Sequence, residues 1–158
     1  MSGPTPEEFR RAMAMVPTPV TVVTAPGDEA AAGATANAVA SLSLDPPLML
    51  VCLDQRSRTL DAVRQSGRFA VNVLASESEE HARTFATRIP HAQKWDGVPA
   101  EDRGGVPILQ EAMVWVICQL RDLLDGGDHT IVTGVVRELG TRDGTPLLFY
   151  DGAYRRLD

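Results

Sequence analysis

The stretches AMVWVICQL at residues 112–120 and HTIVTGVVREL at residues 129–139 predict two neighbouring strands near the end of the chain. Apolar and β-branched residues dominate both stretches, and no helical pattern separates them. Further strand patterns occupy residues 20–24, 34–44, 48–53, 69–74, 146–150 and 154–157. Strands that follow one another without regular helices between them favour an antiparallel barrel over a doubly wound parallel sheet.

A few short helices are predicted around this barrel. Residues 6–15 and 59–66 carry apolar side chains at helical spacing. Ser76 stands three residues before Glu79, which is the spacing of a capping box, and predicts a helix through about residue 87. Residues 90–107 mix proline, glycine and charge, and this mixture predicts a long loop with one helical turn.

Length and composition limit the class of protein. The 158 residues, with 44% hydrophobic and 23% charged residues, predict one globular domain spanning residues 1–158. The 15 basic and 21 acidic residues give a net charge of −6, which disfavours a nucleic-acid partner. No apolar run approaches the roughly 18 residues of a membrane span, so no membrane partner is expected.

The sequence shows neither a targeting signal nor a metal-binding motif. The first residues show no basic start followed by an apolar stretch, which favours a cytoplasmic protein over a secreted one. Cys52 and Cys118 each lie in an apolar run and are interpreted as buried thiols in a reducing compartment. The three histidines are scattered, so no metal site is predicted.

Small and polar residues interrupt the strand patterns in GATAN at residues 33–37 and SLSLDPP at residues 41–47. Small side chains let a flat ligand approach the backbone closely, and the hydroxyl and amide groups can bind its polar edge. The same pattern also suits an ordinary solvent-facing strand.

The segment CLDQRSRT at residues 52–59 runs from a strand end into a helix start. A helix N-terminus presents free N–H groups and the positive end of its dipole, so it suits a phosphate group. Ser57, Arg58 and Thr59 reinforce this hypothesis. Alternatively, Ser57 only caps the helix and the arginines are solvated.

The segment GGDHTI at residues 126–131 places His129 beside two glycines at the start of a strand, where it can reach a ligand or serve only the fold. The last segment, residues 146–157, carries Tyr154 and is otherwise typical of a terminal hairpin. The chain contains no phosphate-binding loop, dinucleotide fingerprint or nucleophile elbow.

Taken in order, several of these pieces resemble the short-chain flavin reductase family, the reductase components of two-component flavin-dependent monooxygenases. The resemblance covers about residues 9–157. Its most specific parts are residues 20–24, 35–37, 41–47, 69–74, 127–130 and 152–157.

This resemblance implies a mainly β fold: an antiparallel, FMN-binding split β-barrel of Greek-key type with a few short peripheral helices. It implies a homodimer that binds FMN or FAD, oxidises NADH or NADPH and supplies reduced flavin to a partner monooxygenase. Two alternatives keep the fold: a non-catalytic flavin- or haem-binding protein for sensing or storage, and a subunit whose barrel mediates assembly.

The resemblance also implies the site residues. Those expected beside the flavin ring and its ribityl chain are Thr35, Ala36, Asn37, Ser41, Leu42, Ser43, Cys52, Leu53 and Asp54. Those expected at its phosphate are Ser57, Arg58 and Thr59, and those expected at the nicotinamide nucleotide are His129 and Tyr154. No catalytic residue is expected, because hydride passes directly between the two cofactors.

Overall fold

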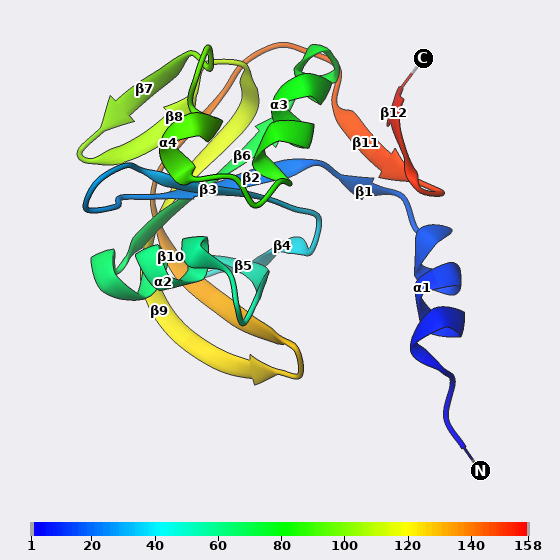
Figure 1. The fold of residues 1–158 in the computed structure, drawn as a ribbon. Coiled ribbons are helices and arrows are strands. Elements are labelled where there is room, and N and C mark those ends of the chain that lie inside the picture. The colour runs from blue at the N-terminus through cyan, green and yellow to red at the C-terminus, as the bar shows by residue number, and fades with distance from the viewer. Residues whose placement is uncertain (1, 158) are drawn as a thin grey trace.

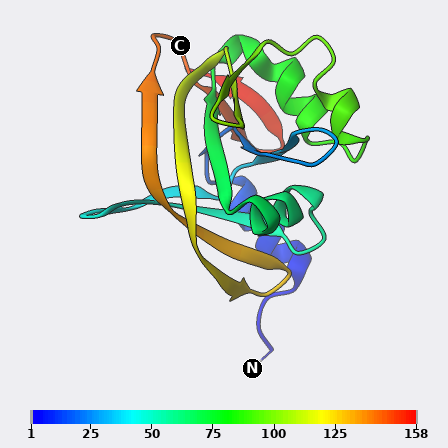
Figure 2. The ribbon, with the colours of Figure 1, turned by 90° about the vertical axis from the view of Figure 1, so that its left-hand side faces the viewer.

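A seven-stranded antiparallel sheet curls into a barrel at the centre of the computed structural model, which describes residues 2–157 (Figures 1 and 2). Its strands are arranged in the order β3-β2-β6-β9-β10-β5-β4. In chain order they are β2 (Thr21–Ala25), β3 (Ala32–Ala36), β4 (Val39–Leu44), β5 (Pro47–Asp54), β6 (Arg68–Leu74), β9 (Ala112–Gly126) and β10 (His129–Thr141). The predicted mainly β, antiparallel fold is confirmed.

Two small sheets accompany the barrel. One consists of β1 (Thr18–Pro19), β11 (Leu147–Tyr150) and β12 (Ala153–Arg156), and the other of β7 (Ala100–Arg103) and β8 (Val106–Leu109). Most of the β7–β8 hairpin lies within residues 90–107, which were predicted to be a long loop with one helical turn. The helical turn is present as α4 (His91–Lys94), but the hairpin was not predicted, because its short strands contain charged residues and a proline and lack a clear alternating pattern.

The helices are short, as predicted: α1 (Pro6–Ala14), α2 (Arg58–Ser66), the 3₁₀ turn η1 (Ser76–Ser78), α3 (Glu79–Phe85) and α4 (His91–Lys94). In Figure 1, α3 and α4 lie on one side of β2 and β3, and α2 lies on the other. Helix α1 stands apart from the barrel beside the C-terminal hairpin, and none of its residues is buried.

The predicted capping box at Ser76 is absent. The Ser76 hydroxyl donates to the adjacent Glu77 carboxylate, and α3 begins only after the 3₁₀ turn. Helix α2, by contrast, follows its sequence signals. The Ser57 hydroxyl accepts the N–H groups of Thr59 and Leu60, and Gly67 ends the helix in the left-handed region at φ 66°.

The core is divided between the two faces of the sheet. Inside the barrel, Phe69, Val51 and Leu60 are fully buried among other aliphatic side chains. On the outer face, Phe85 of α3 and Ile108 of β8 pack against a second buried cluster. Helix α3 and the β7–β8 hairpin are therefore fastened to the barrel by apolar packing.

The barrel has a seam where β3 lies beside β5. No ladder joins these two strands in residues 2–157; the backbone bond from the Cys52 N–H to the Ala38 oxygen (2.9 Å) instead continues the pairing of β4 with β5. The chain leaves β3 at Asn37 and turns into β4, so the single strand predicted over residues 34–44 is wrong and consists of two strands. This break opens the barrel and makes room for a cavity.

Candidate functional site

A cavity of about 370 Å³ lies along this seam. Three alanines, Ala34, Ala36 and Ala38, line it from the β3 side. Of the predicted site residues, it brings together Thr35, Ala36, Asn37, Cys52, Leu53, Asp54, Ser57 and His129. The seam thus has small side chains on one wall and polar groups at its margin, which suits a flat, mainly apolar ring with a polar edge.

The polar groups of β3 differ in whether they are already bonded. The Thr35 hydroxyl donates to the Ala82 oxygen of α3 at 2.6 Å. The Asn37 side-chain oxygen is buried and has no hydrogen-bond partner in the described part of the chain. A buried, unpaired acceptor is costly, and a ligand N–H or O–H in the cavity can satisfy it.

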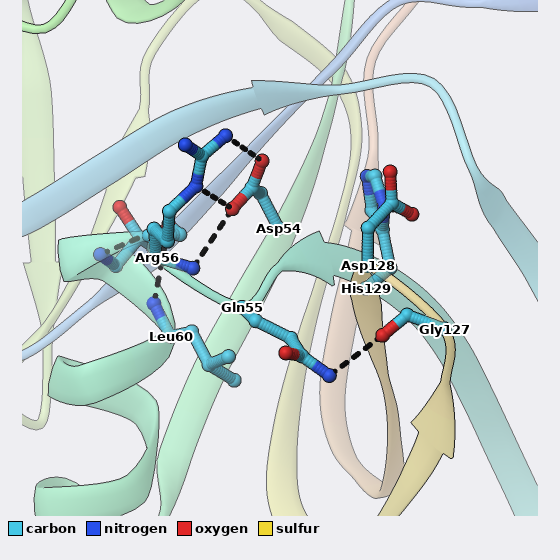
Figure 3. Close-up of polar contacts among 9 residues, drawn as sticks. Asp54, Gln55, Arg56, Leu60, Gly127, Asp128 and His129 are labelled. Atoms are coloured by element: carbon cyan, nitrogen blue, oxygen red, sulfur yellow. Dashed lines mark hydrogen bonds and ion pairs between the residues drawn. The ribbon is translucent and has the colours of Figure 1, made fainter.

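The turn into α2 forms one end of the cavity (Figure 3). The Asp54 carboxylate accepts the backbone N–H of Arg56 at 2.8 Å, and the Arg56 guanidinium lies 3.4 Å away. These hydrogen bonds lower the pKa of Asp54. Because the oxygen of Ser57 accepts the helix N–H groups, its O–H remains available as a donor.

Arg58 and Thr59 have structural roles that the sequence did not show. The Arg58 guanidinium donates to the carbonyl oxygens of Arg88 and Ile89 at 3.1 and 2.6 Å, so it holds the segment between α3 and α4. Thr59 is almost completely buried at the start of the helix. Both still line a second cavity that adjoins the first, so a role at a phosphate stays a prediction.

The tip of the β9–β10 hairpin lies beside this turn, with His129 opposite Asp54 in the β10–β5 pairing. Gly127 adopts φ 76° in the two-residue turn, and its carbonyl oxygen accepts from the Gln55 side chain at 2.7 Å. Figure 3 shows Asp128 and His129 side by side, and the His129 Nδ1 lies 2.7 Å from the Asp128 carboxylate. This contact leaves Nε2 as the ring nitrogen that can meet a ligand.

Known proteins resemble this chain over nearly its whole length. The model of the flavin reductase-like domain matches residues 13–158. The chain belongs to this flavin reductase-like family. It is 39% identical to the reductase component of a 4-nitrophenol 4-monooxygenase/4-nitrocatechol 2-monooxygenase from Rhodococcus opacus, covering 93% of this chain and 78% of that protein. It is 40% identical to an NADH-dependent FMN reductase from Streptomyces nodosus subsp. asukaensis, covering 95% and 84%.

A solved structure also supports membership of this flavin reductase-like family. The NADH:FAD oxidoreductase of Streptomyces globisporus superposes with a TM-score of 0.90 at 34% sequence identity, covering 100% of this chain and 97% of that one. The split barrel implied by the resemblance is therefore confirmed.

The residues of this flavin reductase-like domain fit a flavin in two respects. The alanine-lined wall can accept the flat ring, and the unpaired Asn37 oxygen can accept one of its N–H or O–H groups. The exposed start of α2, with Ser57 and its neighbouring arginines, offers donors to a phosphate.

Four predicted residues do not line either cavity. Ser41, Leu42 and Ser43 lie on β4, where a bulge between Ser41 and Ser43 interrupts the pairing with β5. Tyr154 packs edge-on against Phe149, and the Arg83 guanidinium lies 4.8 Å from its ring. Burial there raises the pKa of Tyr154. Their predicted contacts with flavin or nicotinamide stay predictions.

The sequence patterns did not indicate the part of the second cavity that lies between α3 and α4, where four polar residues line it: Thr87, Arg88, His91 and Lys94. The Lys94 ammonium is buried and donates to the carbonyl oxygens of Gly33 (3.0 Å) and Phe85 (3.3 Å). Burial, together with the nearby Arg58 charge, lowers its pKa. A signal was present, because Lys94 is the single lysine of the chain.

The two cysteine thiols, of Cys52 and Cys118, are free. Burial raises the pKa of Cys52, and it raises that of Cys118 to about 12, so both thiols stay protonated near neutral pH.

No cluster of three potential metal ligands occurs among residues 2–157. In that same range, no helix combines the length and apolar character needed to span a membrane.

Proposed function

We propose that this chain is an NADH-dependent flavin reductase that supplies reduced flavin to a partner monooxygenase. The observation that carries the proposal is the cavity at the β3–β5 seam, with its alanine wall and its unpaired Asn37 oxygen. Relatives named as NADH-dependent flavin reductases and as monooxygenase reductase subunits support it. They give no support to a sensor or storage protein.

The protein's contribution is to bind and orient two cofactors. The bound flavin supplies the redox chemistry, because it accepts hydride from reduced nicotinamide. β3 and β5 would hold the flavin ring, and His129 would meet the nicotinamide nucleotide through Nε2, with Asp128 fixing the orientation of the imidazole. Alignment of this kind accounts for a large part of the rate when the reaction needs no general acid or base.

The experiment compares the wild-type protein with His129→Ala. Purified wild-type protein should oxidise NADH only when a flavin is present. His129→Ala should bind flavin normally, as seen by fluorescence, but raise the KM for NADH or slow hydride transfer by about tenfold or more. Arg64→Gln, on the exposed face of α2, is the matched control and should change neither quantity.

Two outcomes would contradict this proposal. Wild-type protein that binds flavin but does not oxidise NADH is a flavin-binding protein without reductase activity. A His129→Ala protein that loses flavin binding and NADH oxidation together shows that His129 supports the fold, so the nicotinamide site must lie elsewhere.

Assembly and location are part of the same proposal. A homodimer is supported by exposed apolar side chains on α1 and β4, notably Phe9, Met13 and Leu44. Two free thiols are consistent with a cytoplasmic protein. The prediction that residues 1–158 form one domain stays a prediction.

A further inference from the structure

The second cavity continues from the first at the start of α2. It has a volume of about 380 Å³, and the two cavities share Ala34, Thr35, Asp54 and Ser57. From Ser57 it extends to the segment between α3 and α4, where Thr87, Arg88 and His91 line it. A ligand bound along the seam can therefore continue into this second space.

The walls of the second cavity are strongly basic. Arg56, Arg58, Arg88 and Lys94 line it, and Asp54 is the single acidic residue among the lining groups. Asp54 is paired with Arg56, and Lys94 donates to two carbonyl oxygens. Arg88 is exposed and lines the wall, so its guanidinium can reach a ligand anion.

His91 provides a neutral donor in the same wall. Its Nδ1 accepts the Gly33 N–H at 3.5 Å, so the proton of the neutral ring lies on Nε2. That Nε2 is buried and has no partner within residues 2–157. Burial, with the charges of Lys94 and Arg58, lowers the pKa of His91 to about 4, so the ring is neutral near pH 7.

We propose that the second cavity binds the adenosine diphosphate half of FAD, with His91 Nε2 and Arg88 donating to its phosphates, so that this chain prefers FAD to FMN. The proposal rests on the proposed function, because it assumes that the flavin ring occupies the seam. FMN ends at a single phosphate, which belongs at Ser57, where the cavities join. FAD carries a second phosphate and an adenosine beyond that point, and the basic side chains that line the second cavity can bind that phosphate. The relatives do not decide between the flavins, because their names include both FMN and FAD reductases.

The test measures the Kd of riboflavin, FMN and FAD by fluorescence for the wild-type protein and two His91 variants. Wild type should bind FAD about tenfold or more tightly than FMN, the effect of one additional charge-assisted hydrogen bond. His91→Asn keeps an acceptor for the Gly33 N–H but lacks the Nε2 donor, so it should lose about tenfold in FAD affinity and less than about twofold for FMN. His91→Gln places an amide donor near the former Nε2 and should retain most of the FAD affinity.

A second pair of variants keeps the test valid if His91→Asn does not fold. Arg88→Gln removes an exposed charge at the cavity wall, and Arg64→Gln removes an equal charge from an exposed position of α2 that lines neither cavity. Arg88→Gln alone should weaken FAD relative to FMN. ADP should compete with FAD and leave bound riboflavin in place.

Three results would overturn the inference. The first is that the wild-type protein binds FMN and FAD with equal affinity. The second is that Arg88→Gln lowers the affinity for FMN and for FAD by the same factor. The third is that NADH displaces bound ADP whereas FAD does not. The last result would assign the cavity to the nicotinamide dinucleotide. Riboflavin reduction by NADH separates the two proposals, since it must occur if the reductase function holds and does not depend on the second cavity.

Discussion

The two edges of the seven-stranded sheet are completed in different ways. At β3, the chain's own side chains bind the backbone groups left free by the ladder: Trp95 Nε1 donates to the Ala31 oxygen at 2.8 Å, and Lys94 and His91 bond to the two backbone groups of Gly33. At β4, Leu42 and Leu44 are 47% and 91% exposed, and the strand pairs with β5 alone. Unprotected edges promote association. The backbone groups of one edge are therefore bonded within the chain, whereas the other edge is open to pairing with another chain.

The largest expected effect comes from removing the buried cation at the β3 edge. Lys94→Met should lower the free energy of unfolding by about 2–4 kcal/mol, because the Gly33 and Phe85 oxygens each lose a donor in a buried place. Denaturant titration measures the change, with Arg64→Met as an exposed control. A loss equal to that of the control would mean that water replaces the ammonium, and the β3 edge would then resemble the β4 edge.

The next largest effect comes from the close contact between Gly33 of β3 and the Phe85 ring. A Cβ on Gly33 would lie 2.5 Å from the Phe85 ring, so Gly33→Ala should destabilise the protein by about 1–3 kcal/mol. Gly3→Ala, where no atom lies within 4 Å, is the control. In the Phe85→Leu background the cost of Gly33→Ala should shrink, and thermal unfolding of all four proteins measures this coupling. Additive losses would show that the contact with Phe85 is not the cause.

The β4 edge is tested through association. Leu44→Asp should weaken the proposed homodimer by at least about tenfold, or about 1.4 kcal/mol, because it places a charge in an apolar interface. The stability of the isolated subunit should change by less than about 0.5 kcal/mol, since the side chain is exposed there. Sedimentation velocity over a dilution series measures the dimer, with Leu139→Asp as a comparably exposed control. An unchanged dimer would move the interface away from β4.

The smallest effect concerns pH and the β3 edge. The pKa of His91 is about 4 in the folded protein, below its ordinary value of 6.5, so the unfolded chain binds the proton more readily. Stability from this group is therefore present above pH 6.5 and is lost as the pH falls toward 4. His91→Gln should make this acid loss shallower, by less than about 1 kcal/mol because solvent screens a partly exposed ring. The free energy of unfolding of both proteins is measured with denaturant at pH 7 and at pH 5. If both lose the same amount of stability between these pH values, His91 is not the source of the acid sensitivity.

Local patterns predicted much of the fold and of the site. A β-branched run predicted β2, runs rich in apolar residues predicted β5 and β6, and the Ser57 cap with Gly67 predicted α2. The small-residue segment of β3 and the start of α2 do meet in one site, because both border the open seam of the barrel. The resemblance, rather than periodicity, placed His129 beside them.

The parts that the sequence did not predict depend on tertiary contacts. His91 and Lys94 lie on α4, a single helical turn with no clear sequence pattern, and only the position of β3 reveals what their side chains bind. The β7–β8 hairpin is stabilised by the outer core cluster, to which Val106 and Ile108 belong, rather than by a local pattern. The capping box at Ser76 failed because the chain forms a 3₁₀ turn first, which moves the helix start past that residue.

The two hydrogen bonds of Gln55 have a consequence for motion. Its backbone N–H donates to the Asp128 oxygen at 3.1 Å, and its side chain donates to the Gly127 oxygen at 2.7 Å. The hairpin tip that carries His129 and the turn that leads into α2 are therefore fastened at two points. To swing outward as a lid, the tip must break both bonds, at a cost of about 1 kcal/mol each. Any gating of this site by the hairpin tip thus also disturbs the turn into α2, and Gln55→Ala, which removes the side-chain bond but keeps the backbone bond, should weaken this link without abolishing it.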